Sequence, residues 1–136
     1  MRYFCVIIVM ACFLQGCSPS SLEDFRQEGQ SVERALIKEM QKIHSREQLV
    51  AAQPRLSWLF EKLVKVIIEG RDWRDNHPLM EEFPLSNADK RLSDVLRAEL
   101  IRLYQLEGGR DLVEQCQRKA LNRLDAFEQR RTRRRQ

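Results

Sequence analysis

Glycine, proline and aromatic residues are scarce in this sequence, which contains five glycines, four prolines and 7% aromatic residues among its 136 residues. The glycines and prolines fall mainly at the boundaries of apolar stretches, and runs of alternating β-branched residues are lacking, so strand signals are nearly absent. Charged residues make up 32% of the chain and apolar residues 43%. These proportions exclude both a disordered acidic tail and a polytopic membrane protein, and the length suits one small domain.

Recognisable catalytic and nucleotide-binding motifs are also lacking. The two histidines, His44 and His77, are far apart and neither stands in a metal-ligand spacing. The pair Gly108-Gly109 is not accompanied by the further glycines or the lysine of a phosphate-binding loop, and no serine occupies a Gly-x-Ser-x-Gly turn. We therefore predict a protein that is not an enzyme and that needs no cofactor or metal.

One cluster in the middle of the chain is the alternative to that prediction. Asp72, Asp75 and His77 are close enough in sequence to converge on a metal ion in a hydrolase. Arg71 and Arg74 lie among them and would repel a cation, which argues against a metal there. Alanine at His77 would abolish turnover if the cluster were catalytic.

The longest apolar run lies at the very start of the sequence. Arg2 is followed by 12 apolar residues from Tyr3 to Leu14. A membrane-spanning helix needs about 20 such residues, so this run is too short for a permanent transmembrane anchor, and its layout is that of an export signal. No second long apolar run follows it.

The residues after this run add a specific motif. Leu14-Gln15-Gly16-Cys17 resembles the lipobox of bacterial lipoprotein precursors, although the residue at Gln15 is usually smaller. The resemblance implies cleavage after residue 16 and acylation of Cys17 by chains such as palmitate. In such lipoproteins the residue after the cysteine influences the destination. Ser18, in place of an aspartate, implies that the protein is sent to the outer membrane if the cell has two membranes. Two or three acyl chains would hold the protein firmly at the membrane.

This resemblance also determines how the four cysteines are interpreted. Cys5 and Cys12 would be removed with the signal and Cys17 would carry lipid, so only Cys116 remains and no disulfide framework is expected. Cys116 lies at helical spacing from apolar neighbours, which is typical of a small buried hydrophobic residue. A reactive or dimerising thiol is the alternative.

The positive charge is concentrated at the carboxyl end. The net charge is +4, but the 24 basic residues include Arg2 and five arginines near the end, which leaves 18 basic residues against 20 acidic ones. The five are Arg130, Arg131, Arg133, Arg134 and Arg135. They indicate either the end of the last helix, where cations complement the helix dipole, or a contact with anionic lipids or other polyanions. Nucleic-acid binding is not expected, because no aromatic residues are interleaved for base stacking.

Capping signals and apolar stripes predict four main helices. The first is predicted to start after Ser20 or Ser21 and to end near His44, with His44 meeting the dipole at its carboxyl end. Ser45-Arg46-Glu47-Gln48 predicts the amino-terminal cap of a second helix. This helix is apolar around much of its circumference, so we expect it to be the central helix of the bundle. Pro54 lies inside this helix and predicts either a kink or two separate helices over 46–53 and 54–69. Gly70 is predicted to end the helix.

The second half of the chain predicts a helical hairpin. Ser86 with Asp89, or Asn87, caps a helix that ends at Gly108-Gly109, and the last helix begins near Asp111. The long segment 70–86 precedes this hairpin. Its apolar residues indicate either a cap over the end of the bundle or a partner-binding loop. These residues are Trp73, Leu79, Met80 and Phe83.

Together these features predict an all-α protein with a small antiparallel bundle of about four helices. We expect a signal peptide over 1–16, a lipidated tether over 17–21, the bundle over 22–129 and an arginine-rich tail over 130–136. The expected function is a membrane-anchored lipoprotein with a non-enzymatic structural or protein-interaction role in the cell envelope. A module that binds polyanions or anionic lipids through the tail is the alternative. Self-association through the heptad-like first helix is a further possibility.

Overall fold

A computed structural model describes residues 21–79 and 86–134 as four α-helices, with no strand among them. The helices are α2 (Leu22–Met40), α3 (Arg46–Asp75), α4 (Asn87–Tyr104) and α5 (Gly109–Arg134). This confirms the predicted all-α class and the four-helix bundle. None of these helices is long and apolar enough to cross a membrane.

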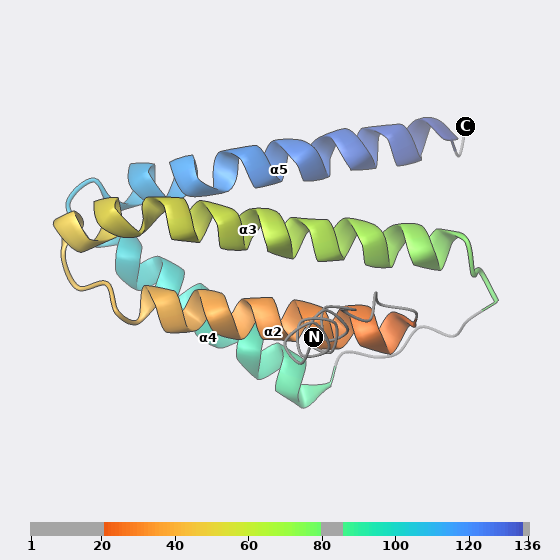
Figure 1. Ribbon diagram of the computed structural model, residues 1–136, viewed down its shortest axis with the longest axis horizontal. Coiled ribbons are helices and arrows are strands. Elements are labelled where there is room, and N and C mark those ends of the chain that lie inside the picture. Colours follow the sequence, from red (N-terminus) through yellow and green to blue (C-terminus); the bar gives the residue numbers. More distant parts are fainter. Residues whose placement is uncertain (1–20, 80–85, 135–136) are drawn as a thin grey trace, which may run out of the picture.

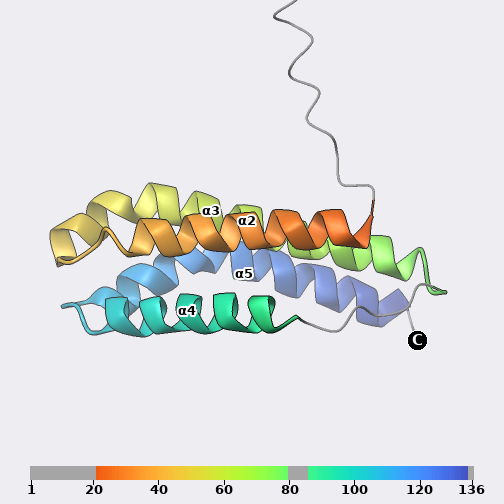
Figure 2. The ribbon, with the colours of Figure 1, turned by 90° about the horizontal axis from the view of Figure 1, so that it is seen from below.

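The bundle consists of two helical hairpins placed side by side (Figures 1 and 2). Consecutive helices run antiparallel. α3 packs against α2 and α5, and α4 packs against the same two helices; within the described residues no Cα atoms of α3 and α4 lie within 8 Å of each other. The segment 76–86 therefore joins helices at opposite corners of the bundle. That diagonal connection explains why the middle link is long while the other two are short.

Two of the predicted capping boxes form as expected. Ser21 Oγ accepts from Asp24 N at 3.1 Å, and the Asp24 carboxylate accepts from Ser21 N at 3.0 Å. Ser86 and Asp89 make the same exchange at the start of α4. Each box satisfies amide groups that the first turn of a helix leaves without partners.

The cap of α3 differs from the prediction in one contact. Ser45 Oγ accepts from Gln48 N at 3.3 Å, but Gln48 Oε1 accepts from His44 N, at 2.7 Å, instead of from the amide of Ser45. The expectation that His44 closes α2 was wrong. α2 ends at Met40, and exposed His44 lies directly before the cap of α3.

Of the two alternatives predicted at Pro54, a kink or two helices, the two separate helices are not formed, because α3 is one helix of 30 residues. Pro54 is exposed, and the carbonyl group that loses its amide partner belongs to Val50, a residue that is 43% exposed. Buried Leu49 and Leu56 hold both sides of the proline in the same core. Gly70 does not end the helix either, since α3 continues for more than a turn to Asp75.

The predicted cap over the end of the bundle is not formed by the described part of segment 70–86. Leu79 is 99% exposed. Trp73 belongs to α3 and stacks on His77 with ring centroids 4.1 Å apart. Met80 and Phe83 lie outside the described residues.

The turn between α4 and α5 depends on its two glycines. α4 ends at Tyr104, before the predicted stop, and Gly108 has a φ of 63°, a conformation that side chains with a Cβ atom disfavour. Gly109 begins α5, two residues earlier than predicted, and a Cβ there would stand 2.0 Å from the carbonyl oxygen of Leu103. Both positions therefore require glycine.

The core lies along the centre of the bundle, and α3 contributes the largest share of it. All four helices supply fully or nearly buried apolar residues, including Leu36, Met40, Leu56, Leu59, Leu103 and Val113. The wide apolar surface of α3 is not completely covered, because Trp58 is 49% exposed with Arg55 over its ring at 4.5 Å. Its large share of the buried apolar residues agrees with the prediction that α3 is the central helix, although it packs against two neighbours as each of the other helices does.

Replacing either interhelical glycine with alanine should stabilise the bundle. A Cβ at Gly29 would lie 3.8 Å from Val66 Cγ1, and one at Gly70 would lie 3.5 Å from Phe25 Cβ, both ordinary contact distances. Alanine favours a helix interior over glycine by up to about 1 kcal/mol. We expect Gly29→Ala and Gly70→Ala each to raise the free energy of unfolding by about 0.5–1 kcal/mol in urea titrations. A loss of stability in both would contradict this packing.

Candidate functional site

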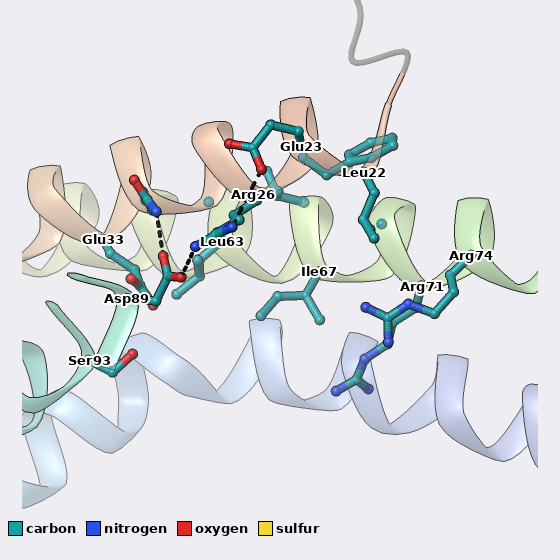
Figure 3. Close-up of a pocket in the computed structure, with 15 residues that line it drawn as sticks. Leu22, Glu23, Arg26, Glu33, Leu63, Ile67, Arg71, Arg74, Asp89 and Ser93 are labelled. Carbon is teal, nitrogen blue, oxygen red and sulfur yellow. Dashed lines mark hydrogen bonds and ion pairs between the residues drawn. The ribbon is translucent and has the colours of Figure 1, made fainter. Parts of the chain in front are cut away.

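A groove lies at the end of the bundle where α2 begins and α3 ends (Figure 3). It has a volume of about 570 Å³. Side chains from α2, α3 and the first turns of α4 line it. The apolar ones are half-buried, with the exception of fully buried Val66; they are Leu22, Phe25, Leu63 and Ile67.

Helix lengths explain why the groove exists. α3 has 30 residues and α4 has 18, and α4 begins only at Asn87. The last turns of α3, with Ile67, Gly70 and Arg71, therefore face the groove beside the first turn of α4, which contributes Asp89. Within residues 21–79 and 86–134, the shorter α4 thus leaves apolar surface of α2 and α3 uncovered at this end.

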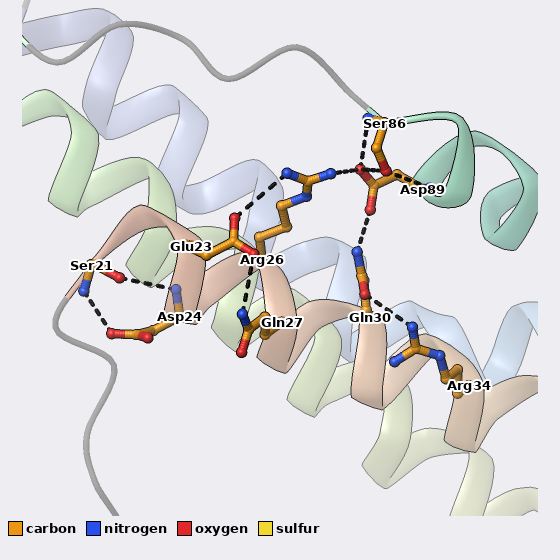
Figure 4. A network of polar contacts seen from close by, with 9 residues as sticks. All are labelled: Ser21, Glu23, Asp24, Arg26, Gln27, Gln30, Arg34, Ser86 and Asp89. Carbon is orange, nitrogen blue, oxygen red and sulfur yellow. Dashed lines mark hydrogen bonds and ion pairs between the residues drawn. The ribbon is translucent and has the colours of Figure 1, made fainter.

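One wall of the groove is a polar network centred on Asp89 (Figure 4). The carboxylate is 7% exposed and accepts hydrogen bonds from Arg26 and Gln30 of α2. The same carboxylate accepts from Ser86 N at 2.8 Å and Ser86 Oγ at 2.7 Å. Asp89 thus joins the cap of α4 to α2. Arg26 retains one buried nitrogen, Nε, without a hydrogen-bond partner.

These contacts shift the acidities of two carboxyl groups at the groove. The hydrogen bond from Arg26, followed by those from Ser86 and Gln30, holds the pKa of Asp89 well below its usual range. The pKa of Glu33 is raised, first by burial and then by the charge of Asp89. The groove therefore contains two different carboxyl groups. Asp89 is ionised and its charge is balanced by Arg26, whereas Glu33 is a weaker acid than usual.

The arginine-rich segment continues α5 as a helix as far as Arg134, and Arg135 lies outside the described residues. Arg131 forms a two-bond ion pair with Asp75 of α3, at 2.6 and 2.7 Å. Arg130 Nε donates to the carbonyl of Ala126 at 3.2 Å, and the side chains of Arg133 and Arg134 are exposed. One of the predicted contact residues is thus engaged within the bundle.

The candidate metal residues are not brought together. Asp75 pairs with Arg131, and the Nδ1 atom of His77 lies 2.7 Å from the carbonyl oxygen of Trp73. Within residues 21–79 and 86–134, no group of three or more histidine, cysteine or acidic side chains is arranged to hold a metal ion.

Cys116 lies in the core, as predicted from its apolar stripe. It is 2% exposed, its Sγ lies 3.8 Å from the carbonyl oxygen of Gln53, and burial raises the pKa of the thiol. Both properties disfavour the reactive thiolate.

We expect iodoacetamide to alkylate Cys116 at least about 100-fold more slowly in the folded protein than in urea, because alkylation requires opening of the core. Peptide mass spectrometry would separate its rate from those of the other cysteines, and Cys116→Ser provides the blank. Equal rates in both conditions would contradict the burial.

The remaining predicted site residue, Cys17, lies outside the described residues, as does the whole predicted signal over 1–16. Comparison with known proteins gives no match to a family model, to a curated protein or to a solved structure.

The groove itself was not found by the sequence analysis. Its apolar residues Leu22, Phe25, Leu63 and Ile67 belong to the apolar stripes of their helices, and periodicity does not distinguish a covered position from an uncovered one. Asp89 was identified as a capping residue, whereas its contacts with α2 span about 60 positions of the chain and have no local signal.

Proposed function

We propose that this protein is a bacterial lipoprotein, anchored through Cys17, with a non-enzymatic structural or protein-interaction role in the cell envelope. The observation that carries the proposal is the lipobox-like sequence placed directly before a capped helical bundle. Ser21, four residues after Cys17, is already the cap of α2. A short polar link between an acylated cysteine and a folded domain is the arrangement that a lipid-anchored protein requires.

The helical bundle is consistent with a role in contact rather than catalysis. Two of the polar residues at the groove with shifted pKa values, Asp89 and Arg26, are paired with each other across two helices. Such a pair stabilises the fold, and we assign it no chemical step. The uncovered apolar groove beside it provides a surface for binding.

The intact mass of the protein expressed in a diderm bacterium tests the anchor. We expect a chain that begins at Cys17 with two or three acyl groups and partitions into the detergent phase of Triton X-114. The Cys17→Ala variant should retain residues 1–16 and carry no lipid, whereas Cys12→Ala, a matched control, should be processed normally. An unacylated wild-type chain would refute the proposal.

The second candidate function, contact with an anionic surface, is favoured by one observation. The carboxyl end of α5 and the start of α2 lie at the same end of the bundle (Figures 1 and 2). If Cys17 is anchored, exposed Arg133 and Arg134 face the same membrane. Each such arginine contributes about 1 kcal/mol near an anionic bilayer at low salt.

Charge removal at the end of α5 distinguishes this candidate from the first. The triple change of Arg130, Arg133 and Arg134 to glutamine should reduce binding of the Cys17→Ala chain to phosphatidylglycerol vesicles by about tenfold or more at low salt. A matched triple change at exposed Arg91, Arg97 and Arg118 should have a smaller effect. Equal, salt-insensitive binding by all forms would reject the candidate.

A further inference from the structure

The outer face of α3 carries a stripe of five side chains that the core of the bundle does not use. Its members follow one another at intervals of three or four residues, so they lie on one side of the helix. They are Glu47, Ala51, Pro54, Trp58 and Lys62. The first four are exposed and Lys62 is half-buried. Trp58, the largest of them, is 49% exposed, and exposed tryptophans are enriched where proteins contact one another.

The position of α3 makes this stripe accessible to another molecule. α3 runs along one edge of the bundle and α4 along the opposite edge, with α2 and α5 between them (Figure 2). The core residues Leu49, Leu56 and Phe60 lie on the opposite side of α3 from Trp58, at about 100° of turn per residue. A helix of another molecule can therefore approach the stripe from outside.

The two ends of the stripe carry opposite charges. Glu47 lies in the first turn of α3, and Lys62 lies about four turns further along. Hydrogen bonds from its own amide and from Ser45 lower the pKa of Glu47, so its carboxylate is ionised at neutral pH. The Lys62 ammonium lies 5.3 Å from the ring centroid of Trp58. Neither side chain forms an ion pair with another residue in the described part of the chain, so both charges are available to a partner.

This order of side chains is complementary to itself when two copies of α3 run antiparallel. If Glu47 of one protomer lies beside the partner's Lys62, Ala51 faces the partner's Trp58, and Pro54 lies near the twofold axis. Each large side chain then meets a small one, and each charge meets the opposite charge. Because the arrangement is twofold symmetric, every one of these contacts is made twice.

We infer that this protein forms a twofold symmetric dimer through the outer stripe of α3, with the two helices antiparallel and Glu47 paired with the partner's Lys62. A parallel pair would instead bring like charges together at both ends of the stripe. One helix from each protomer makes a small interface, so the dimer should dissociate on dilution into the low micromolar range. The inference concerns the bundle and does not depend on acylation of Cys17.

Two charge reversals test the pairing directly. Glu47→Lys has cations at both ends of the stripe and Lys62→Glu has acids at both ends, so each variant should dimerise about tenfold less well than wild type. Mixed in equal amounts, the two variants should dimerise with each other as well as wild type does, because each like-charged pair is replaced by an opposite pair. Sedimentation velocity of the full chain in a non-ionic detergent, with Cys17→Ala in every form to exclude the predicted lipid, measures the association.

Further variants locate the contact on α3. Trp58→Ala should weaken dimerisation by about tenfold, whereas Ile101→Ala, at a 53% exposed position of α4, should leave it unchanged. A benzophenone side chain in place of Ala51 should give a crosslinked dimer on illumination. In a mixture of nitrogen-14 and nitrogen-15 chains, the crosslink should join it to the other chain's peptide that contains Trp58.

Arg55 provides a test of the antiparallel register. It lies at the edge of the stripe, 4.5 Å from the ring centroid of Trp58, and near the twofold axis it comes close to the partner's Arg55. Arg55→Gln removes this repulsion and should strengthen the dimer at low salt, although the residue lies beside the same tryptophan. A dimer weakened by this change would contradict the register.

Three results would overturn the inference. The first is a mixture of Glu47→Lys and Lys62→Glu that is no more dimeric than either variant by itself. The second is undiminished dimerisation of Trp58→Ala, which would assign the association to another surface such as α2. The third is a monomer mass that does not change with protein concentration. Far-UV circular dichroism of each variant verifies that the bundle is folded.

Discussion

Asp89→Asn should lower the melting temperature of the bundle by roughly 10 °C at neutral pH and loosen α4 before the other helices. The substitution leaves the guanidinium of Arg26 without its main partner in a half-buried position and weakens the bonds from Gln30 and Ser86. Leu103 is the single buried apolar residue of α4, so polar contacts provide a large share of its attachment to the bundle. Hydrogen exchange should therefore accelerate across α4 more than across α3.

The matched control for this change is Asp94→Asn. Asp94 lies on the same helix and also pairs with an arginine, but its side chain is 70% exposed. Exposed pairs contribute about 0–1 kcal/mol, so the melting temperature should change by a few degrees at most. Similar losses from both variants would mean that Asp89 acts as an ordinary surface charge.

Acid titration gives an independent test of the same carboxylate. The pKa of Asp89 is lower in the folded chain than in the unfolded chain, so its stabilising contribution is complete above the unfolded pKa, near 4. That contribution declines as the pH falls from about 4 toward the folded pKa. The difference in free energy of unfolding between wild type and Asp89→Asn should thus be constant from pH 5 to 7 and narrow below pH 4.

Arg102→Gln should cost about 2 kcal/mol, because this side chain ties the other end of α4 to the end of α2. Its two terminal nitrogens donate to the carbonyl oxygens of Ile43 and Met40, both at 2.7 Å. These carbonyls lie at and just beyond the end of α2, where carbonyl groups no longer have the regular amide partners of a helix, although Met40 O also accepts from Ile43 N at 3.0 Å. The charged donor thus acts as a cap supplied by a neighbouring helix. Urea titration at neutral pH measures the loss.

Arg97→Gln is the control for Arg102. Each arginine pairs with an acid three residues earlier, Asp94 at 3.3 Å and Glu99 at 2.8 Å. Only Arg102 reaches the backbone of α2. A loss below about 0.5 kcal/mol for Arg97→Gln with about 2 kcal/mol for Arg102→Gln would isolate the capping contacts. Equal losses would attribute the effect to the local ion pairs.

Local signals allowed the helices and their starts to be predicted well. A capping box requires two side chains three residues apart, so Ser21 and Ser86 could be identified from adjacent sequence, and both serve as caps. The apolar stripe around Cys116 correctly predicted its burial, and its neighbours Val113 and Ala120 lie with it in the core. These features depend on positions within one or two turns of each other.

The errors came from positions at which packing overrides a local preference. Pro54 and Gly70 are both poor helix residues, yet α3 continues through them because apolar residues before and after them pack against other helices. The groove could not be predicted for a related reason. It depends on the unequal lengths of α3 and α4 and on a diagonal connection, which only the tertiary arrangement defines.

The diagonal connection has a consequence for assembly. Each hairpin, α2–α3 or α4–α5, buries its apolar face mainly against the other through the α3–α5 and α2–α4 contacts. A hairpin from a second copy of the chain offers the same faces, so two chains can exchange hairpins and keep every interhelical contact while only segment 76–86 changes its course. Domain swapping of this kind conserves the monomer's interfaces, and its extent is set by protein concentration and by the length of that segment.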